Sequence, residues 1–213
     1  FMKLDKKDML LYAVTDRSWL GCESLSFQVE RILEGGVTFV QHREKMLRAD
    51  RFLEEARTLK GVCEKFGVPF VINDNVDIAI ASGAHGVHIG QEDMEAKTVR
   101  RLIGKDMILG VSVRSVEEAI RAERDGADYL GAGAVFHTDS KPDAQYISHE
   151  LLKDICSAVS IPVVAIGGIN KENIKYLSQS GISGAAVISA IFAQDDLKKA
   201  AAELRKEIEG CLT

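Results

Sequence analysis

The stretch GAHGVHIGQED, residues 83–93, contains every part of a unit that recurs along the chain. It opens with Gly83-Ala84, and glycine accepts the left-handed backbone with which a helix ends before a short loop. Residues 86–89 (GVHI) then form a short apolar run of the strand type. Polar residues follow, from Gln91 to Asp93. This order predicts a strand that is reached from a helix and ends beside polar side chains.

The same order repeats from one end of the chain to the other. Between the apolar runs, apolar residues are spaced three and four apart, as in Leu53, Ala56, Leu59 and Cys63, which predicts amphipathic helices. Strands that are apolar throughout and alternate with helices are typical of parallel sheets. Eight such units predict an α/β protein with a single (β/α)8 TIM barrel, and a doubly wound open sheet is the alternative. The expected strands are residues 9–14, 37–41, 70–72, 86–89, 108–112, 129–132, 163–166 and 185–188.

The bulk composition fits one barrel that acts on small molecules. A chain of 213 residues, 46% hydrophobic and 28% charged, can bury a large core, and no linker divides it, so residues 1–213 are expected to form one domain. A net charge of −5 with dispersed Lys and Arg argues against nucleic-acid or membrane-surface binding. No apolar run could cross a bilayer, and the four cysteines lack a C-x-x-C pair, so we expect a cytoplasmic protein with reduced thiols. The sequence leaves open whether the protein forms a homo-oligomer.

The exit of the second strand carries the sequence QHREK, residues 41–45. In a barrel of this kind the site lies at the carboxyl ends of the strands, so each exit is a candidate. Side chains alternate along a strand, so Gln41 and Arg43 are expected to project together while His42 and Glu44 turn away. With Lys45 they suggest an anion site. The alternative is a solvated strand end of mixed charge.

Carboxylates follow the next two strands. Asn73 and Asp74 end the third strand and Asp93 follows the fourth, while Asn75 is the expected cap of the following helix. Mg²⁺ takes a few protein carboxylates and completes its shell with phosphate oxygens and water. Together with Arg43 and Lys45, Asp74 and Asp93 therefore suggest a magnesium-diphosphate site. The alternative is that Asp93 only caps a helix beginning at Met94.

The remaining exits offer polar groups and bare backbone. Ser112 ends the fifth strand, and the sixth opens into a long irregular stretch, residues 131–143, of the kind that forms a lid or binding loop. Within it, Thr138, Ser140 and Lys141 suit a polar or anionic ligand. Gly167-Gly168 and Ile188-Ser189 leave strands seven and eight, where barrels commonly bind phosphate. Two anion sites in one barrel mouth suit a transferase that expels diphosphate from one substrate and joins the remainder to a second.

At this point the chain resembles a known family, the thiamine phosphate synthases. The motifs that carry the resemblance lie in the family's order between residues 41 and 191. The segments QHREK and HIGQED are specific, and the others gain weight from the order. The matching segments are residues 41–45, 72–74, 88–93, 110–112, 138–141, 167–169 and 187–191.

The resemblance implies a Mg²⁺-dependent barrel enzyme that joins hydroxymethylpyrimidine diphosphate to a thiazole phosphate, giving thiamine phosphate and diphosphate. The step it implies is dissociative, with departure of diphosphate before the thiazole nitrogen attacks. Asp74 and Asp93 would ligate Mg²⁺, and the catalytic set would be Arg43, Lys45, Ser112 and Lys141. The diphosphate would contact Arg43, Lys45, Asn73 and Lys141, and the pyrimidine would contact Gln41 and Ser112. The thiazole ring would contact Thr138, Asp139 and Ser140. The thiazole phosphate would contact Gly168, Ile188 and Ser189.

Two rival readings stay open beside this one. A thiazole tautomerase shares the barrel and the thiazole-phosphate site, but it carries His where this chain has Ala134 and lacks the carboxylate pair. A barrel that only binds thiamine precursors is the second rival. The chain also departs from the usual family pattern at His137, Asp139 and Ser140. His85, His88 and His149 lack partners at metal-ligand spacing, so structural roles are expected for them.

Overall fold

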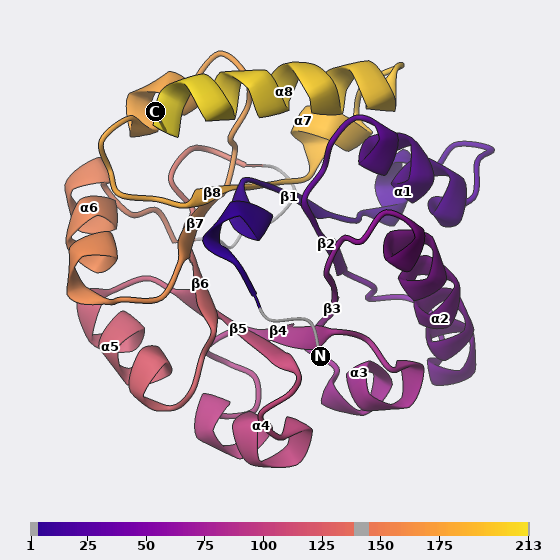
Figure 1. Cartoon of the computed structure of the whole chain (residues 1–213), viewed down its shortest axis with the longest axis horizontal. Coiled ribbons are helices and arrows are strands. Elements are labelled where there is room, and N and C mark those ends of the chain that lie inside the picture. Colours follow the sequence, from indigo (N-terminus) through magenta and orange to yellow (C-terminus); the bar gives the residue numbers. More distant parts are fainter. Residues whose placement is uncertain (1–3, 139–144, 213) are drawn as a thin grey trace.

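Eight parallel strands close into a barrel in the order of the sequence (Figure 1). The structure is a computed structural model that describes residues 4–138 and 145–212. The ring is closed by pairing of the first strand with the last, in the register Leu11 with Ala185. The predicted barrel is therefore confirmed and the open sheet is excluded. The strands are β1 (Leu11–Val14), β2 (Phe39–His42), β3 (Phe70–Asn73), β4 (Gly86–Ile89), β5 (Ile108–Val113), β6 (Tyr129–Gly133), β7 (Val163–Ile166) and β8 (Gly184–Val187).

Helices surround this barrel, and several of the described ones depart from a repeat of one helix per strand: η2 and α1 both follow β1, and α7 and α8 both follow β8. The described segment after β7 forms a short 3₁₀ helix, so the expectation of one amphipathic α-helix after every strand is wrong there. At the chain's start, Met9 lies in a 3₁₀ helix rather than in the first strand. The helices are η1 (Lys6–Met9), η2 (Arg17–Trp19), α1 (Leu25–Glu34), α2 (Ala49–Lys65), α3 (Val76–Ser82), α4 (Ala96–Ile103), α5 (Val116–Arg124), α6 (His149–Ala158), η3 (Ile174–Leu177), α7 (Ser189–Phe192) and α8 (Leu197–Leu212), with η marking 3₁₀ helices.

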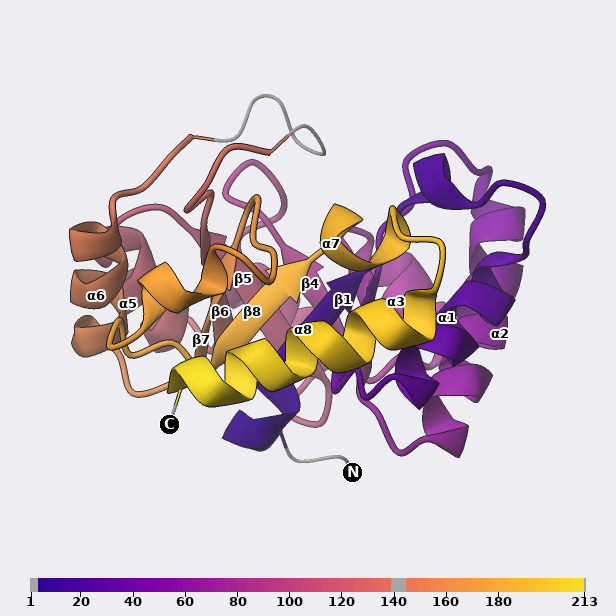
Figure 2. The ribbon, with the colours of Figure 1, turned by 90° about the horizontal axis from the view of Figure 1, so that it is seen from above.

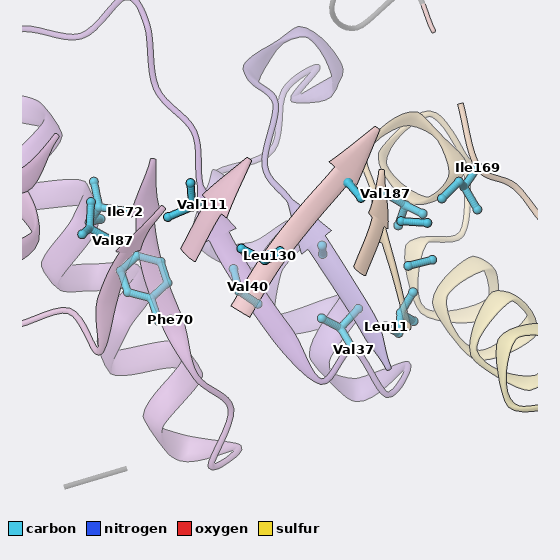
Figure 3. Close-up of a cluster of buried hydrophobic side chains, with 14 of the residues drawn as sticks. Leu11, Val37, Val40, Phe70, Ile72, Val87, Val111, Leu130, Ile169 and Val187 are labelled. Atoms are coloured by element: carbon cyan, nitrogen blue, oxygen red, sulfur yellow. The ribbon is translucent and has the colours of Figure 1, made fainter. Parts of the chain in front are cut away.

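The larger hydrophobic core lies between the strands and the helices. Residues such as Val40, Ile72 and Leu130 point outward from the barrel wall and are fully buried (Figure 3). Among the cysteines on helices, Cys63 is buried in α2 and Cys156 packs against the core from α6. Both are free thiols. Outward-facing strand residues thus hold the helices in place around the barrel.

A second core fills the barrel itself. Tyr12, Phe39 and Tyr129 are its large members, with ring centroids 4.5 Å apart for Tyr12 and Phe39 and 5.4 Å apart for Phe39 and Tyr129. Each is at most 1% exposed. Burying an aromatic ring of this size contributes about 1.5–3 kcal/mol to stability. The interior is therefore a packed layer, and it forms the floor beneath the strand exits.

The two ends of the barrel differ. Figure 2 shows η1 below the barrel, while the loops that follow the carboxyl ends of the strands gather on the opposite side. Gly83 ends α3 with φ of +68°, as its predicted capping role requires, and Asn75 caps the start of that helix by accepting from the Ile78 amide at 2.9 Å. Among the described residues, no helix has both the length and the apolar character needed to span a membrane. The strand exits and their loops are therefore the part to search for a site.

Candidate active site

A cavity of about 500 Å³ opens at the carboxyl ends of the strands. Every predicted site residue that the structure describes contributes to its wall. Asp139, Ser140 and Lys141 lie outside the described residues, so their predicted roles stay predictions. The predicted residues that line the cavity are Gln41, Arg43, Lys45, Asn73, Asp74, Asp93, Ser112, Thr138, Gly168, Ile188 and Ser189.

The alternation predicted for residues 41–45 is observed. Gln41 and Arg43 line the cavity, whereas His42 lies on the other side of β2 against α2, its ring centroid 5.0 Å from that of Phe52. The hydroxyl of Thr15 accepts a hydrogen bond from the Arg43 amide at 3.1 Å and lies 3.2 Å from Nδ1 of His42. The exit of β2 is thus held by β1, and its cation-bearing face is turned inward.

A network of charges on the outer side fixes the loop that carries Lys45. Arg17 donates to Glu44 at 2.6 Å and to Glu55 of α2 at 2.5 Å. Glu44 also accepts from the backbone amides of residues 46 and 47, at 2.5 and 3.1 Å. Burial acts to raise the pKa of Glu44, but these hydrogen bonds outweigh it and leave that pKa lowered. Glu44 therefore stays ionised and clamps the loop.

Glu55 joins this network to His42. Its carboxylate lies 3.3 Å from Nε2 of His42, close enough for electrostatic contact but outside good hydrogen-bond geometry. Burial acts to raise the pKa of Glu55, while His42 and Arg17 together lower it below its ordinary value. The residues of QHREK that turn away from the cavity are thus bound to a common support.

Lys45, Asp74 and Asp93 meet at one rim of the cavity. Lys45 Nζ donates to Asp74 Oδ2 at 2.6 Å. Asp74 has a left-handed φ of +62°, which is uncommon outside glycine, and its amide donates to the carbonyl of His88 at 2.7 Å. Burial raises the pKa of Asp93, and the neighbouring Asp74 carboxylate adds to that effect, while a hydrogen bond from Gly90 opposes it. Two carboxylates from adjacent strands therefore stand side by side next to a cation.

The alternative role for Asp93, a helix cap, is wrong. The helix begins at Ala96 rather than Met94, and its N-cap is Glu95. Asp93 instead accepts from the Gly90 amide at 2.7 Å, which folds the turn after β4 back toward Asp74.

These two carboxylates fit a Mg²⁺ ion bound together with a phosphorylated ligand. Within residues 4–138 and 145–212 there is no group of three or more His, Cys, Asp or Glu side chains that could hold a metal alone. Mg²⁺ is commonly bound through one or two carboxylates, with substrate phosphates and water in the other positions. Asp74 and Asp93 lie close together, and the pKa of Asp93 is raised in part by the Asp74 carboxylate. A cation bound between them would relieve this repulsion between like charges.

The opposite rim is lined by backbone. Gly167 and Gly168 have φ values of +101° and +63°, and a Cβ on Gly168 would meet the carbonyl oxygen of His137 far inside van der Waals contact. Asn173 holds the turn by donating to the Gly168 carbonyl at 2.8 Å. Only glycine lets the chain pass this closely, so the bare edge predicted after β7 is present.

Several cavity residues were given no site role from the sequence, among them Gln91, Arg114 and Gln145. Gln91 donates to the carbonyl of Ser112 at 2.7 Å and accepts from Arg121 at 2.8 Å. Arg114 lines the rim beyond Ser112, and Gln145 lines it from the loop before α6. Since Arg114 stands two residues after Ser112, the same alternation that predicted Arg43 from Gln41 could have found it.

A chain of hydrogen bonds crosses the barrel floor and joins two of the predicted site residues. From the Gln41 amide nitrogen the steps are 2.5 Å to the Tyr12 hydroxyl, 2.7 Å to the Tyr129 hydroxyl and 2.9 Å to Nδ1 of His88. A last step of 2.9 Å joins Nε2 of His88 to the Ser112 hydroxyl. Gln41 and Ser112, on opposite sides of the floor, are therefore connected through buried side chains. Both ring nitrogens of His88 have hydrogen-bond partners, as expected for a structural histidine.

Sequence and fold both match known proteins. A family model described as Thiamine monophosphate synthase matches residues 11–191. The thiamine-phosphate synthases of Clostridium tetani and Ruminiclostridium cellulolyticum are 51% and 50% identical, over 92% and 93% of this chain and 94% and 95% of their own lengths. A thiamine phosphate pyrophosphorylase structure from Pyrococcus furiosus has a TM-score of 0.90 at 42% identity, covering 98% of this chain and 99% of its own.

A closed barrel whose polar cavity opens at the carboxyl ends of its strands defines the class, a (β/α)8-barrel enzyme. The chain belongs to the thiamine monophosphate synthase family and is a transferase. The resemblance drawn from the ordered motifs is thus confirmed.

Proposed function

We propose that this chain is a Mg²⁺-dependent thiamine phosphate synthase. It transfers the hydroxymethylpyrimidine group from its diphosphate to a thiazole phosphate, giving thiamine phosphate and diphosphate. One observation supports this above the family membership: Lys45, Asp74 and Asp93, from three neighbouring strands, converge at one rim of the cavity beside Arg43. A diphosphate needs this combination of cations and metal-binding carboxylates.

The leaving group is bound at this rim. Asp74 and Asp93 would hold Mg²⁺, which supplies neutralisation of the negative charge on the departing diphosphate. Arg43 and Lys45 donate charge-assisted hydrogen bonds to phosphate oxygens, with Asn73 beside them. Lys141, which lies outside the described residues, remains a predicted contact of the diphosphate. Because Arg17 and Glu44 hold the loop from behind, the backbone that carries Lys45 is already fixed at the rim where the diphosphate would bind.

The other substrate is bound across the cavity. Gly168, Ile188 and Ser189 contact the thiazole phosphate and Thr138 contacts the thiazole ring. Asp139 and Ser140, which lie outside the described residues, remain predicted contacts of that ring. Gln41 and Ser112 contact the pyrimidine on the barrel floor. Binding in this way would bring the thiazole nitrogen against the carbon that loses diphosphate. The carbon–oxygen bond to diphosphate breaks, the thiazole nitrogen then supplies an electron pair to that carbon, and no side chain is needed as a nucleophile.

Neither rival has comparable support. A thiazole tautomerase has no use for a carboxylate pair beside Lys45, and Ala134, where that relative carries His, lines the cavity of this chain. A barrel that only binds thiamine precursors would form no thiamine phosphate from the two substrates.

The test is turnover with both substrates. The purified chain is incubated with hydroxymethylpyrimidine diphosphate, thiazole phosphate and Mg²⁺, and thiamine phosphate and diphosphate are measured as they form. Equal amounts of both products are expected, and chelation of Mg²⁺ should stop the reaction. Absence of both products would refute the proposed function.

The metal assignment is tested separately with Asp93→Ala. Removing this carboxylate should abolish Mg²⁺-dependent turnover while leaving the affinity for thiazole phosphate, measured by calorimetry, nearly unchanged, because that ligand binds at the opposite rim. Normal turnover by Asp93→Ala would exclude Asp93 as a metal ligand.

A further inference from the structure

The chain of hydrogen bonds across the barrel floor has a direction. Tyr12 and Tyr129 are fully buried, and burial raises the pKa of both phenols, so each carries one hydrogen. The Gln41 amide nitrogen donates to the Tyr12 oxygen. Tyr12 then donates to Tyr129, since the opposite sense would give the Tyr12 oxygen two donors and leave its own hydrogen without an acceptor.

The positions of the remaining hydrogens, as far as Ser112, follow in the same way. Tyr129 has passed its one hydrogen to Nδ1 of His88, so His88 carries its hydrogen on Nε2. That nitrogen donates to the oxygen of Ser112. The hydroxyl hydrogen of Ser112 is thereby released from this bond and can point into the cavity that Ser112 lines.

The two ends of this series of hydrogen bonds therefore offer opposite groups to a ligand, an acceptor at Gln41 and a donor at Ser112. Gln41 has turned its amide nitrogen to Tyr12 and has its carbonyl oxygen to offer a ligand as an acceptor. Ser112 offers a donor. An aminopyrimidine has the complementary pair, an amino group that donates and a ring nitrogen that accepts. Side chains fixed in advance need no reorientation when the ligand arrives, which strengthens binding.

Two glycines inside strands make room for this chain. A Cβ on Gly110 of β5 would lie 2.5 Å from Nδ1 of His88 and nearer still to Cζ and Oη of Tyr129. A Cβ on Gly131 of β6 would lie 3.3 Å from Cε1 of His88. Glycine inside a strand costs stability and marks the close approach of another group. Here the approaching group in both cases is the middle of the hydrogen-bond chain.

We propose that Tyr12, Tyr129 and His88 form a positioning relay that fixes Gln41 as an acceptor and Ser112 as a donor toward the pyrimidine. The three relay residues act through Gln41 and Ser112, so they determine how the pyrimidine is recognised without taking part in the chemistry. This inference rests on the proposed function for the identity of the ligand, whereas the direction of the relay is independent of it.

The direction is tested first, on the wild-type chain. Nitrogen NMR of the protein with isotopically labelled histidine identifies which ring nitrogen of His88 carries hydrogen. The expected result is hydrogen on Nε2, and loss of the Nδ1 hydrogen-bond signature in Tyr129→Phe. Hydrogen on Nδ1 of His88 in the wild type would overturn the relay, whatever substrate the enzyme uses.

The second test separates recognition of the two substrates. Tyr12→Phe and Tyr129→Phe keep the aromatic ring but break the relay, so KM for the pyrimidine diphosphate should rise about tenfold, as for loss of one buried hydrogen bond. KM for the thiazole phosphate should stay within about twofold, because its site lies across the cavity. The matched control is Tyr176→Phe, the same change at a side chain that is 62% exposed.

Two outcomes would overturn the relay here. One is an unchanged KM for the pyrimidine diphosphate in both variants, and the other is an equal loss of affinity for both substrates, which indicates general damage to the barrel. If the wild type makes no thiamine phosphate, the proposed function fails, and the His88 measurement still decides the direction of the relay.

Discussion

Gly110→Ala offers the most direct test of how tightly the barrel floor is packed. The added methyl group would lie 2.5 Å from Nδ1 of His88 and closer still to two atoms of Tyr129. Ordinary contact between such atoms begins near 3.5 Å, so the rings of His88 and Tyr129 would have to move by roughly 1 Å. Tyr129 is fully buried, and its ring centroid lies 5.8 Å from that of Tyr12 and 5.4 Å from that of Phe39.

The size of the effect follows from two terms. Forcing an extra methyl group into a packed core costs about 1–3 kcal/mol. A displaced Tyr129 also loses its bonds to Tyr12 and His88, and a buried polar group left without a partner costs about 1–3 kcal/mol. The expected total is about 2–6 kcal/mol, a large part of the roughly 5–15 kcal/mol that stabilises a typical domain.

Urea unfolding of matched glycine variants measures this. Gly61→Ala in α2 adds a methyl group with nothing within 4 Å and should gain about 0.5–1 kcal/mol from helix propensity. Gly131→Ala, whose Cβ would be 3.3 Å from the nearest atom, should lose a smaller amount than Gly110→Ala. If Gly110→Ala is as stable as Gly131→Ala, the floor is not packed as described. Should Gly110→Ala fail to fold, the ordering of the other two variants still tests the reasoning.

Two further predictions concern the rims of the cavity. Gly168→Ala should raise KM for thiazole phosphate at least tenfold, because its methyl group meets the His137 carbonyl; Gly67→Ala has a similar φ of +67° in open space and should affect stability but not KM. Glu55→Gln should lower the thermal midpoint at pH 7 through loss of its contacts with Arg17. Since folding lowers the pKa of Glu55, its contribution is present above its ordinary value of 4.5 and is lost as pH falls through the folded pKa. The gap between Glu55→Gln and wild type should therefore close in acid, and a constant gap would contradict this role for its charge.

The fold was predictable from the sequence because its signals are local. Each expected strand overlaps an observed one, and errors are confined to the ends. The second strand begins at Phe39 rather than Val37, because Thr38 precedes it and uses its hydroxyl to accept from the Leu11 amide at 2.9 Å. Such a contact with a distant residue leaves no trace in the hydrophobic pattern.

The site was predictable where one rule was sufficient. Alternation along β2 predicts that Gln41 and Arg43 point into the cavity, and the position of the strand exits predicts that Asp74 and Asp93 lie close together, as the structure shows. Both inferences use only the direction of a side chain and the order of strands. Arg114 was within reach of the same rule.

The relay was not predictable in this way. Tyr12 and Tyr129 sit in apolar runs separated by more than a hundred residues, and each one in isolation is an ordinary core residue. Which hydroxyl meets which depends on how the barrel closes. The available signal was Gly110, a glycine inside a predicted strand, which indicates that some other group comes close to the backbone.

The chemistry of the barrel floor itself argues that the relay concerns the ligand. Phenylalanine at Tyr12 and Tyr129 would fill the same space, but it would leave the Gln41 amide nitrogen and Nδ1 of His88 without their hydrogen-bond partners. The hydroxyls therefore add little to packing that the rings do not already supply. What they add is a defined orientation of Gln41 and Ser112, the two ends that emerge in the cavity. The polar floor is thus better explained by what binds above it than by the stability of the barrel.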